Sequence, residues 1–180
     1  MAYYYLVSQL PNISSSESKS ALPLSTEAFK ELCSRFVSEK EKELVDALSL
    51  VPPREREATG SVFLDTWYEK ERNLRFALAQ IRAQKMKKEA YTLPDGCTAD
   101  IITAARTAVG MDSPYSAEQF LYDYRLKLLD DIKPLDSFSM DAVYAYGLKL
   151  MLVERMRKFD VENGKSSYHK IYDTILGENV

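Results

Sequence analysis

One long stretch near the C-terminal end of the chain constrains the fold more than any other. Within 142–153 the only charged residue is Lys149, while apolar residues recur at helical spacing around more than one side. A helix that is apolar all round is normally buried, because none of its faces favours contact with water. The sequence therefore predicts a helix over 139–159 that lies in the middle of a packed protein.

The N-terminal end of this predicted helix is marked by residue type. Ser139 can accept hydrogen bonds from the free backbone N–H groups of the first turn, and Asp141 follows where the helix dipole favours negative charge. Phe138 and Val143 stand five positions apart, the spacing of a hydrophobic staple. The same arrangement, Ser or Thr flanked by apolar residues five apart, recurs at Ser25, Thr98 and Ser116.

Earlier segments also have helical periodicity. A helix from Ser25 is expected to bury Phe29, Leu32, Cys33 and Phe36, and a Ser38/Glu41 capping box is expected to open the next helix. A long helix is predicted over 61–88, where Phe76 widens the apolar face and Glu71 and Arg75 are spaced to pair across one turn.

The two ends of the chain and the segment before the central helix complete the prediction. A capping box of Ser116 and Gln119 predicts a helix through Leu129, and a final amphipathic segment follows Asn163-Gly164. The apolar stretch 3–10 fits either a short strand or a short buried helix, since periodicity cannot distinguish them over so few residues. The polar stretch 12–20 is expected to be a loop.

Composition supports a helical protein. The 180 residues include only six glycines and seven prolines, which is few for a turn-rich β-sandwich or barrel. The predicted class is all-α, a multi-helix bundle of about six to eight helices. We expect a single domain over 1–180, with possible helical lobes at 1–93 and 94–180.

Charge and cysteine usage indicate the compartment and exclude some partners. A net charge of −3 favours neither nucleic acid nor an anionic membrane, and Cys33 and Cys97 stand alone without a framework spacing. The N-terminal end lacks the basic region of a signal peptide, and no uncharged run approaches the roughly 18 residues of a membrane span. The sequence predicts a cytoplasmic protein that is peripheral to the inner face of the membrane at most.

The residues show no catalytic, cofactor-binding or metal-binding constellation, so we do not expect an enzyme. His169 is the only histidine, and only Asp173 stands near it at helical spacing, which indicates a surface histidine rather than a metal site. Glycine-rich phosphate-binding motifs are absent. Cys33 has the spacing of a core residue, and Asp130-Asp131 fits a solvated helix end.

Two surface features remain open to two interpretations each. The second half of the predicted helix 61–88 is rich in basic residues: Arg72, Arg75, Arg82, Lys85, Lys87 and Lys88. They form either a solvated face or a docking surface for an acidic partner. The chain also has twelve tyrosines, which are common both at interfaces and at the boundary of a core.

Three segments resemble an uncharacterised bacterial family whose members are encoded beside the subunits of V/A-type ATPases in spirochaetes, chlamydiae and Bacteroides-like bacteria. They are 1–11 (Met-Ala-Tyr-Tyr-Tyr-Leu-Val-Ser-Gln-Leu-Pro), 22–29 (Leu-Pro-Leu-Ser-Thr-Glu-Ala-Phe) and 144–155 (Tyr-Ala-Tyr-Gly-Leu-Lys-Leu-Met-Leu-Val-Glu-Arg). The resemblance spans most of the chain, and no motif in it is catalytic.

A more distant similarity is to the C subunit of those ATPases (d in eukaryotes), a helical funnel that seats the central shaft on the rotor ring. The runs 67–75 and 81–83 are similar to that subunit's helices, which carry an acidic-Asn-Leu-Arg run followed by Arg-Ala, and 152–157 resembles a degenerate second copy. The C subunit is longer and has three such helical units, so this chain has room for fewer.

The resemblance implies a non-catalytic subunit or accessory protein that couples the shaft to the rotor ring, with those subunits as partners. Its docking faces would lie on the long helix, at Trp67, Tyr68, Arg72, Arg75, Arg82 and Lys85. Two alternatives remain: a free-standing helical interaction module or regulator, and a small-molecule enzyme with a carboxylate or tyrosine pocket. No cofactor is expected.

Overall fold

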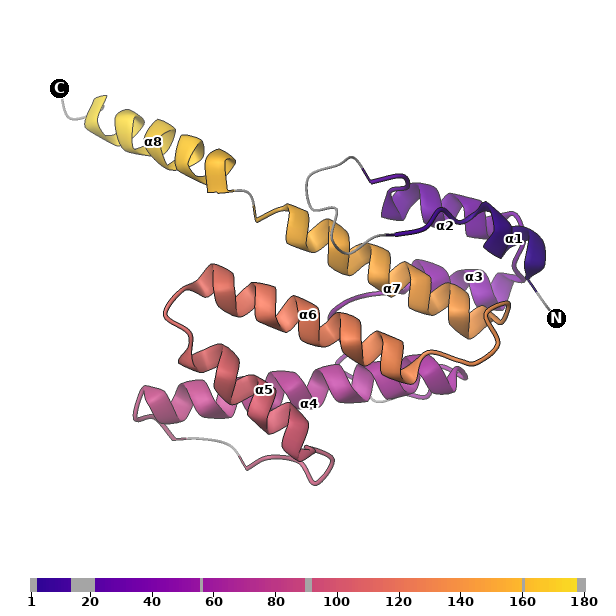
Figure 1. Ribbon diagram of the computed structural model, residues 1–180, viewed down its shortest axis with the longest axis horizontal. Helices are drawn as coiled ribbons and strands as arrows, with labels where there is room; N and C mark the ends of the chain where they lie inside the picture. Colours follow the sequence, from indigo (N-terminus) through magenta and orange to yellow (C-terminus); the bar gives the residue numbers. More distant parts are fainter. Residues whose placement is uncertain (1–2, 14–21, 56, 90–91, 160, 178–180) are drawn as a thin grey trace.

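The computed structural model describes residues 3–13, 22–55, 57–89, 92–159 and 161–177 (Figure 1). Over these residues the chain forms eight α-helices and no strand, which confirms the predicted all-α class. The helices are α1 (Tyr4–Gln9), α2 (Thr26–Ser34), α3 (Glu39–Asp46), α4 (Val62–Lys85), α5 (Ala99–Gly110), α6 (Pro114–Ile132), α7 (Met140–Arg157) and α8 (Val161–Gly177).

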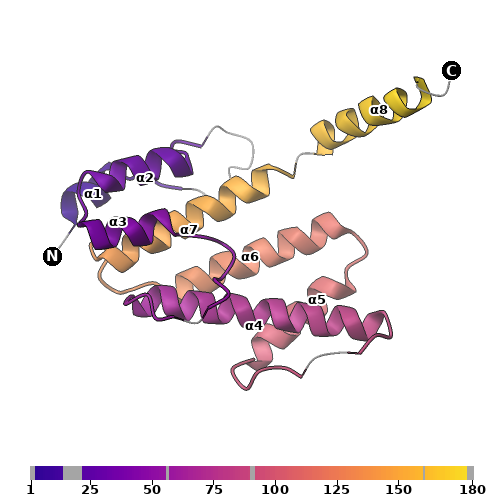
Figure 2. The ribbon, with the colours of Figure 1, turned by 180° about the vertical axis from the view of Figure 1, so that it is seen from behind.

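Helix α7 occupies the centre of the fold, as its apolar sequence predicts. Ser139 caps it, its hydroxyl accepting a hydrogen bond from the Ala142 N–H. Helices α2 and α3 pack against it from one side, and α4 and α6 from the other (Figures 1 and 2). Leu150 and Leu148 are therefore both fully buried, although they project from different sides of the helix.

The buried side chains form two clusters. The larger surrounds α7 and includes Phe29, Val45, Trp67 and Leu150. The smaller joins the second half of α4 to α5 and α6, with Leu74 and other side chains from these helices at its centre. Both clusters contain side chains from before and after residue 94, and the division into lobes at that point stays a prediction.

The N-terminal segment forms a helix, not the alternative strand. The backbone N–H of Tyr3 donates to the Phe138 carbonyl at 2.9 Å, and the Tyr4 and Phe138 rings lie 4.5 Å apart. Phe138, the residue predicted to staple α7, thus contacts α1. The Tyr146 hydroxyl donates to the Pro11 carbonyl, which holds the chain after α1 against α7. Most of the predicted polar loop, 14–20, lies outside the described residues.

Helix starts agree with the sequence in most places. The Ser25 hydroxyl accepts from the Ala28 N–H, and the Ser38 N–H donates to the Glu41 carboxylate at 2.8 Å. The Ser61 hydroxyl accepts from the Leu64 N–H, capping α4. The three predicted helix starts are confirmed.

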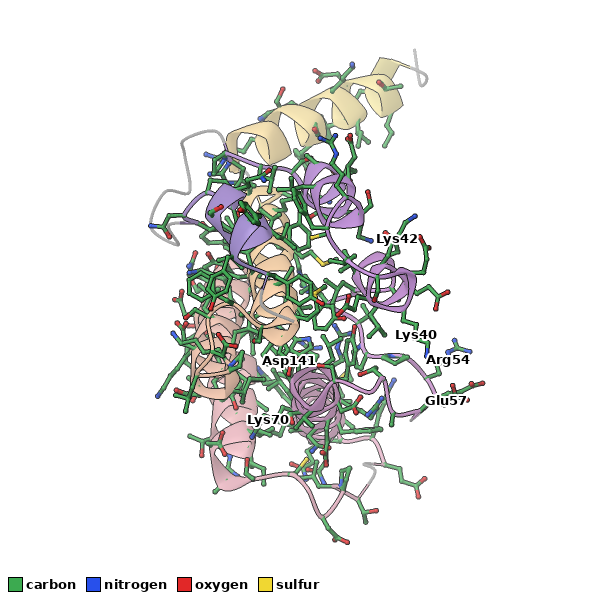
Figure 3. All side chains as sticks on the ribbon, turned by 90° about the vertical axis from the view of Figure 1, so that its right-hand side faces the viewer. Lys40, Lys42, Arg54, Glu57, Lys70 and Asp141 are labelled. Carbon is green, nitrogen blue, oxygen red and sulfur yellow. The ribbon has the colours of Figure 1, made fainter. Side chains whose placement is uncertain are left out.

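The Ser61 hydroxyl also links two helices. It donates to the Asp141 carboxylate at 2.6 Å, and Asp141 lies between the N-terminal ends of α7 and α4 (Figure 3). The capping residue of α4 and the first-turn acid of α7 therefore meet, 80 positions apart in sequence.

Three predicted boundaries are wrong. Helix α6 begins at Pro114 with Ser113 as its cap, because proline is favourable in the first helical turn, so Ser116 lies inside the helix. Helix α4 ends at Lys85, and Lys87 adopts a left-handed backbone with φ 54°. Helix α8 begins before Asn163-Gly164 and continues through them.

Two aromatic side chains were expected in the core and are exposed. Phe36 follows the C-cap of α2 and is 39% exposed. Helical spacing does not predict its burial, because the residue lies beyond the end of the helix. Phe76 lies on α4 beside buried Ala77 and is 42% exposed, because α5 and α6 cover the neighbouring face. Thr98 occupies the cap position of α5, but its side chain makes no capping hydrogen bond.

Candidate functional site

A buried ion cluster joins α4 to α6. The Glu71 side chain is fully buried, and the Arg125 guanidinium donates to both its oxygens, Nε and Nη2 each at 2.9 Å. Arg75, one turn along α4, donates from Nε to Glu71 Oε1 at 2.8 Å. The predicted Glu71–Arg75 pair is confirmed, but it belongs to a buried three-residue cluster. A carboxylate needs such partners when it is removed from water.

The same region of α4 holds the neighbouring loops. Arg75 Nη2 donates to the Leu50 carbonyl at 3.2 Å, and Arg72 Nη2 donates to the Pro53 carbonyl at 3.0 Å. On another side, Asn73 Nδ2 donates to the Gly96 carbonyl at 3.1 Å. Arg72, Asn73 and Arg75 therefore fix the segments before α4 and before α5 to the long helix.

Of the six predicted docking residues, two lie in the core. Trp67 is fully buried and Tyr68 is 7% exposed. The Trp67 indole N–H has no hydrogen-bond partner within the described part of the chain. Both rings pack in the core, and only Tyr68 reaches the surface, at the wall of a cleft beside α4.

The remaining four divide into two pairs. Arg72 and Arg75 are half-buried and hold loop carbonyls, whereas Arg82 and Lys85 are exposed near the C-terminal end of α4. Lys85 Nζ donates to the Val109 carbonyl at 3.0 Å, which links α4 to α5. Arg82 and Lys85, together with exposed Lys87 and Lys88, form the basic end of α4.

A groove lies between the C-terminal part of α6 and the N-terminal part of α7. It has a volume of about 490 Å³. Its walls are mainly apolar, with Leu126 and Leu129 from α6 and Ala142 and Ala145 from α7, and its rim carries charged residues of both signs: Asp130, Asp131, Lys133 and Lys149. Leu135, also at this groove, is wholly exposed.

A second, smaller cleft lies beside the first half of α4. It has a volume of about 250 Å³, and four carboxylates line it: Glu55, Glu57, Asp65 and Glu69. The Asp65 carboxylate already has hydrogen-bond partners, because it accepts from the Thr59 N–H and hydroxyl, both at 2.9 Å. Lys40 and Lys42 of α3 lie on the same side of the molecule as Arg54 and Glu57 (Figure 3).

Several tyrosines have altered acidity because they are buried. Burial raises the pKa of Tyr146 to about 12, and burial together with a hydrogen bond to Asp100 raises the pKa of Tyr124 further. Burial, with a smaller effect from Asp46, raises the pKa of the Cys33 thiol to about 12. Groups shifted in this direction stay protonated near neutral pH, so they are poor bases and poor nucleophiles there.

Neither a metal-binding cluster nor a membrane-spanning helix was found in the part of the chain that the structure describes. No three His, Cys, Asp or Glu residues among those positions are arranged to hold a metal ion. His169 is exposed, with its ring 5.8 Å from that of Tyr168. The described helices are all too short or too polar to cross a bilayer.

Helix α8 presents an apolar face to solvent. Tyr168, Ile171, Tyr172 and Ile175 recur with the 3–4 residue spacing of one helix face, and Leu176 extends it. Each is between 49% and 64% exposed. The helix extends away from the other seven (Figures 1 and 2). The amphipathic pattern is visible in the sequence, but only the tertiary structure shows that this face is exposed among the described residues.

Comparison with known proteins matches part of the chain to a family model. The model of a family described as "Protein of unknown function (DUF2764)" matches residues 106–179. This segment contains the end of α5 and all of α6, α7 and α8. Neither the curated proteins nor the solved structures contain a match to the chain.

Proposed function

We propose that this chain is a non-catalytic subunit or accessory protein of a V/A-type ATPase, and that it couples the central shaft to the rotor ring. The proposal rests on the resemblance of 67–75 and 81–83 to helices of the C subunit, and on the resemblance of the chain to a family encoded beside such ATPases. Its partners would be the shaft and ring subunits, and any association with the membrane would be peripheral.

One structural observation supports the proposal most. The run that resembles the C subunit contains the residues that hold the helices of this protein together. Glu71 binds Arg125 of α6, Asn73 binds the segment before α5, and Leu74 is fully buried between these helices. A resemblance in such residues concerns how helices pack, which is the property that a C-like subunit would share.

The mechanism under this proposal is mechanical. A coupling subunit must resist deformation between two partners, and a close-packed helical body transmits strain with little compression. The bidentate Arg125–Glu71 contact and the Ser61–Asp141 hydrogen bond join α4 to α6 and α7. The exposed basic end of α4, at Arg82 and Lys85, offers a charged docking surface for an acidic partner.

Affinity purification of the tagged chain from gently solubilised native membranes, followed by quantitative mass spectrometry, tests the proposal. We expect the catalytic, shaft and ring subunits to be recovered in fixed ratio. An unaccompanied chain would contradict the proposal and would favour the alternative, a free-standing interaction module or regulator, which the uncovered face of α8 also fits.

Charge reversal tests the docking surface within the same experiment. Reversal of Arg72, Arg75 or Lys85 would disturb the carbonyl contacts that these side chains make, so the informative variant is Arg82→Glu with Lys88→Glu, at exposed positions of the basic end of α4. We expect it to reduce recovery of the partners while the far-UV circular dichroism stays unchanged. Lys40→Glu with Lys42→Glu, on α3 (Figure 3), is the matched control. Equal recovery with both variants would show that the basic end of α4 is only a solvated face.

A further inference from the structure

We propose that two copies of this chain associate by reciprocal exchange, so that α8 of each copy packs in the α6–α7 groove of the other. The described residues include two apolar surfaces that are exposed to solvent. One is the convex face of α8, at Tyr168, Ile171, Tyr172 and Ile175, and the other is the concave groove between α6 and α7. Both lie within 106–179, the segment matched by one family model.

The two surfaces agree in length. The apolar face of α8 spans 168–176, about 12 Å of helix, and the groove is lined by 126–133 of α6 and 142–149 of α7, each about 11 Å long. Ala142 and Ala145 present small side chains on the α7 wall, which lets a third helix approach closely. Leu135, wholly exposed at the groove, would be covered by this helix.

The charges at the edges are also complementary. The groove has Asp130 and Asp131 at one part of its rim and Lys149 at another. The exposed side of α8 carries Lys165 on one side of the apolar face and Asp173 farther along the helix. Asp130 already pairs with Lys133 at 3.2 Å, so an α8 helix in the groove has an opposite charge available for Asp131 and for Lys149.

The position of α8 favours exchange between copies over contact within one chain. The groove is lined by 142–149, near the start of α7, whereas α8 follows the far end of α7 and extends away from the body (Figures 1 and 2). Its apolar face offers roughly 400 Å² of surface, which is within the size of a functional patch on a monomer. Two reciprocal contacts bury this face twice together with the two grooves, which approaches the roughly 1,200 Å² lower bound of a specific stable interface.

The mass of the full chain in solution, measured by analytical ultracentrifugation over a wide concentration range, tests this proposal. We expect twice the 20.6 kDa of one chain. Ile171→Glu with Ile175→Glu on α8, and Leu135→Glu at the groove, should each raise the dimer dissociation constant about tenfold or more, since each change occurs twice per dimer. All three positions are at least half exposed, so the fold should not be affected.

Matched controls separate this effect from a general effect of added charge. Ser166→Glu with Thr174→Glu places two new carboxylates on α8 outside the apolar face, and Val62→Glu changes an exposed apolar residue on α4. We expect these variants to remain dimeric. A wild-type chain that is monomeric throughout the concentration range would overturn the proposal, including the case in which α8 folds back onto its own groove.

Cross-linking identifies which surfaces meet. In a Cys97→Ser background, a mixture of Leu135→Cys and Tyr172→Cys chains should form a disulfide-linked heterodimer under mild oxidation. Tyr172→Cys chains alone should form little. Efficient cross-linking of Tyr172→Cys to itself, in a dimer that Leu135→Glu leaves intact, would show that α8 pairs with α8 and would overturn exchange into the groove.

Discussion

The Arg125 guanidinium of α6 donates two hydrogen bonds, both 2.9 Å long, to the two carboxylate oxygens of Glu71 on α4. Glu71 is fully buried, and Arg125 is 6% exposed. This pair connects α4 to α6 through two residues that are 54 positions apart in sequence. The connection is specific because each buried charge depends on the other for stabilisation once both have left water.

Removal of one partner of this pair should be costly. Arg125→Met leaves Glu71 with only Arg75, which is itself partly exposed, and we expect a loss of about 3–5 kcal/mol in the free energy of unfolding. Urea denaturation followed by circular dichroism measures it. The exposed pair Glu31–Arg35 is the control, where Glu31→Gln should cost less than about 1 kcal/mol. Similar small losses for both variants would mean that the buried pair contributes little.

Gly147 of α7 marks a close approach of two helices. A Cβ atom at this position would lie 2.7 Å from Phe29 Cε1 and 2.9 Å from Leu48 Cδ1. We therefore expect Gly147→Ala to lower stability by about 1–3 kcal/mol through overpacking, although alanine is the better helix former. Gly110→Ala is the control, because a Cβ atom there meets nothing within 4 Å. Thermal denaturation should show a lower melting temperature for Gly147→Ala and an unchanged or higher melting temperature for Gly110→Ala.

The burial of α7 on all sides predicts the cost of a cavity. Leu150 is fully buried, and Leu150→Ala should lower the free energy of unfolding by about 2–5 kcal/mol. Val62→Ala, at a position that is 80% exposed on α4, should have little effect and serves as the control. A loss below about 1 kcal/mol at Leu150 would indicate that the core around α7 collapses to fill the space.

Stability should fall in the alkaline range. Burial raises the pKa of Tyr146 to about 12, above the 10.0 of a free tyrosine, so the folded state keeps this proton while the unfolded state releases it. Between pH 10 and pH 12 the unfolded state binds fewer protons, and the free energy of unfolding therefore decreases as pH rises, by about 1.4 kcal/mol per pH unit for one such group.

Tyr146→Phe isolates this contribution. Compared with the wild type, the variant should lose less stability between pH 10 and pH 12 in urea titrations, because the ring stays buried while the ionisable hydroxyl is gone. At neutral pH it should be less stable, since the hydroxyl donates to the Pro11 carbonyl. An identical slope for both proteins above pH 10 would show that Tyr146 ionises as freely in the folded state as in the unfolded chain.

The helical class, the central position of α7 and the starts of most helices follow from the sequence alone. These properties depend on residues within a few positions of one another: the apolar run at 142–153, and the caps at Ser25, Ser61 and Ser139. The start of α6 differs from the prediction because Ser113 and Pro114 form the helix start in place of the Ser116 capping box, and both signals are local in the sequence.

Which of these side chains a partner can reach depends on how the helices pack together. Trp67 and Tyr68 lie in the core, Glu71 gains Arg125 from another helix, and the apolar face of α8 lies uncovered. Periodicity identifies the face of a helix but not what packs against it, because that depends on contacts between residues far apart in sequence. The physical reason is that burial and desolvation are properties of the assembled fold, whereas capping and helical spacing are properties of a single segment.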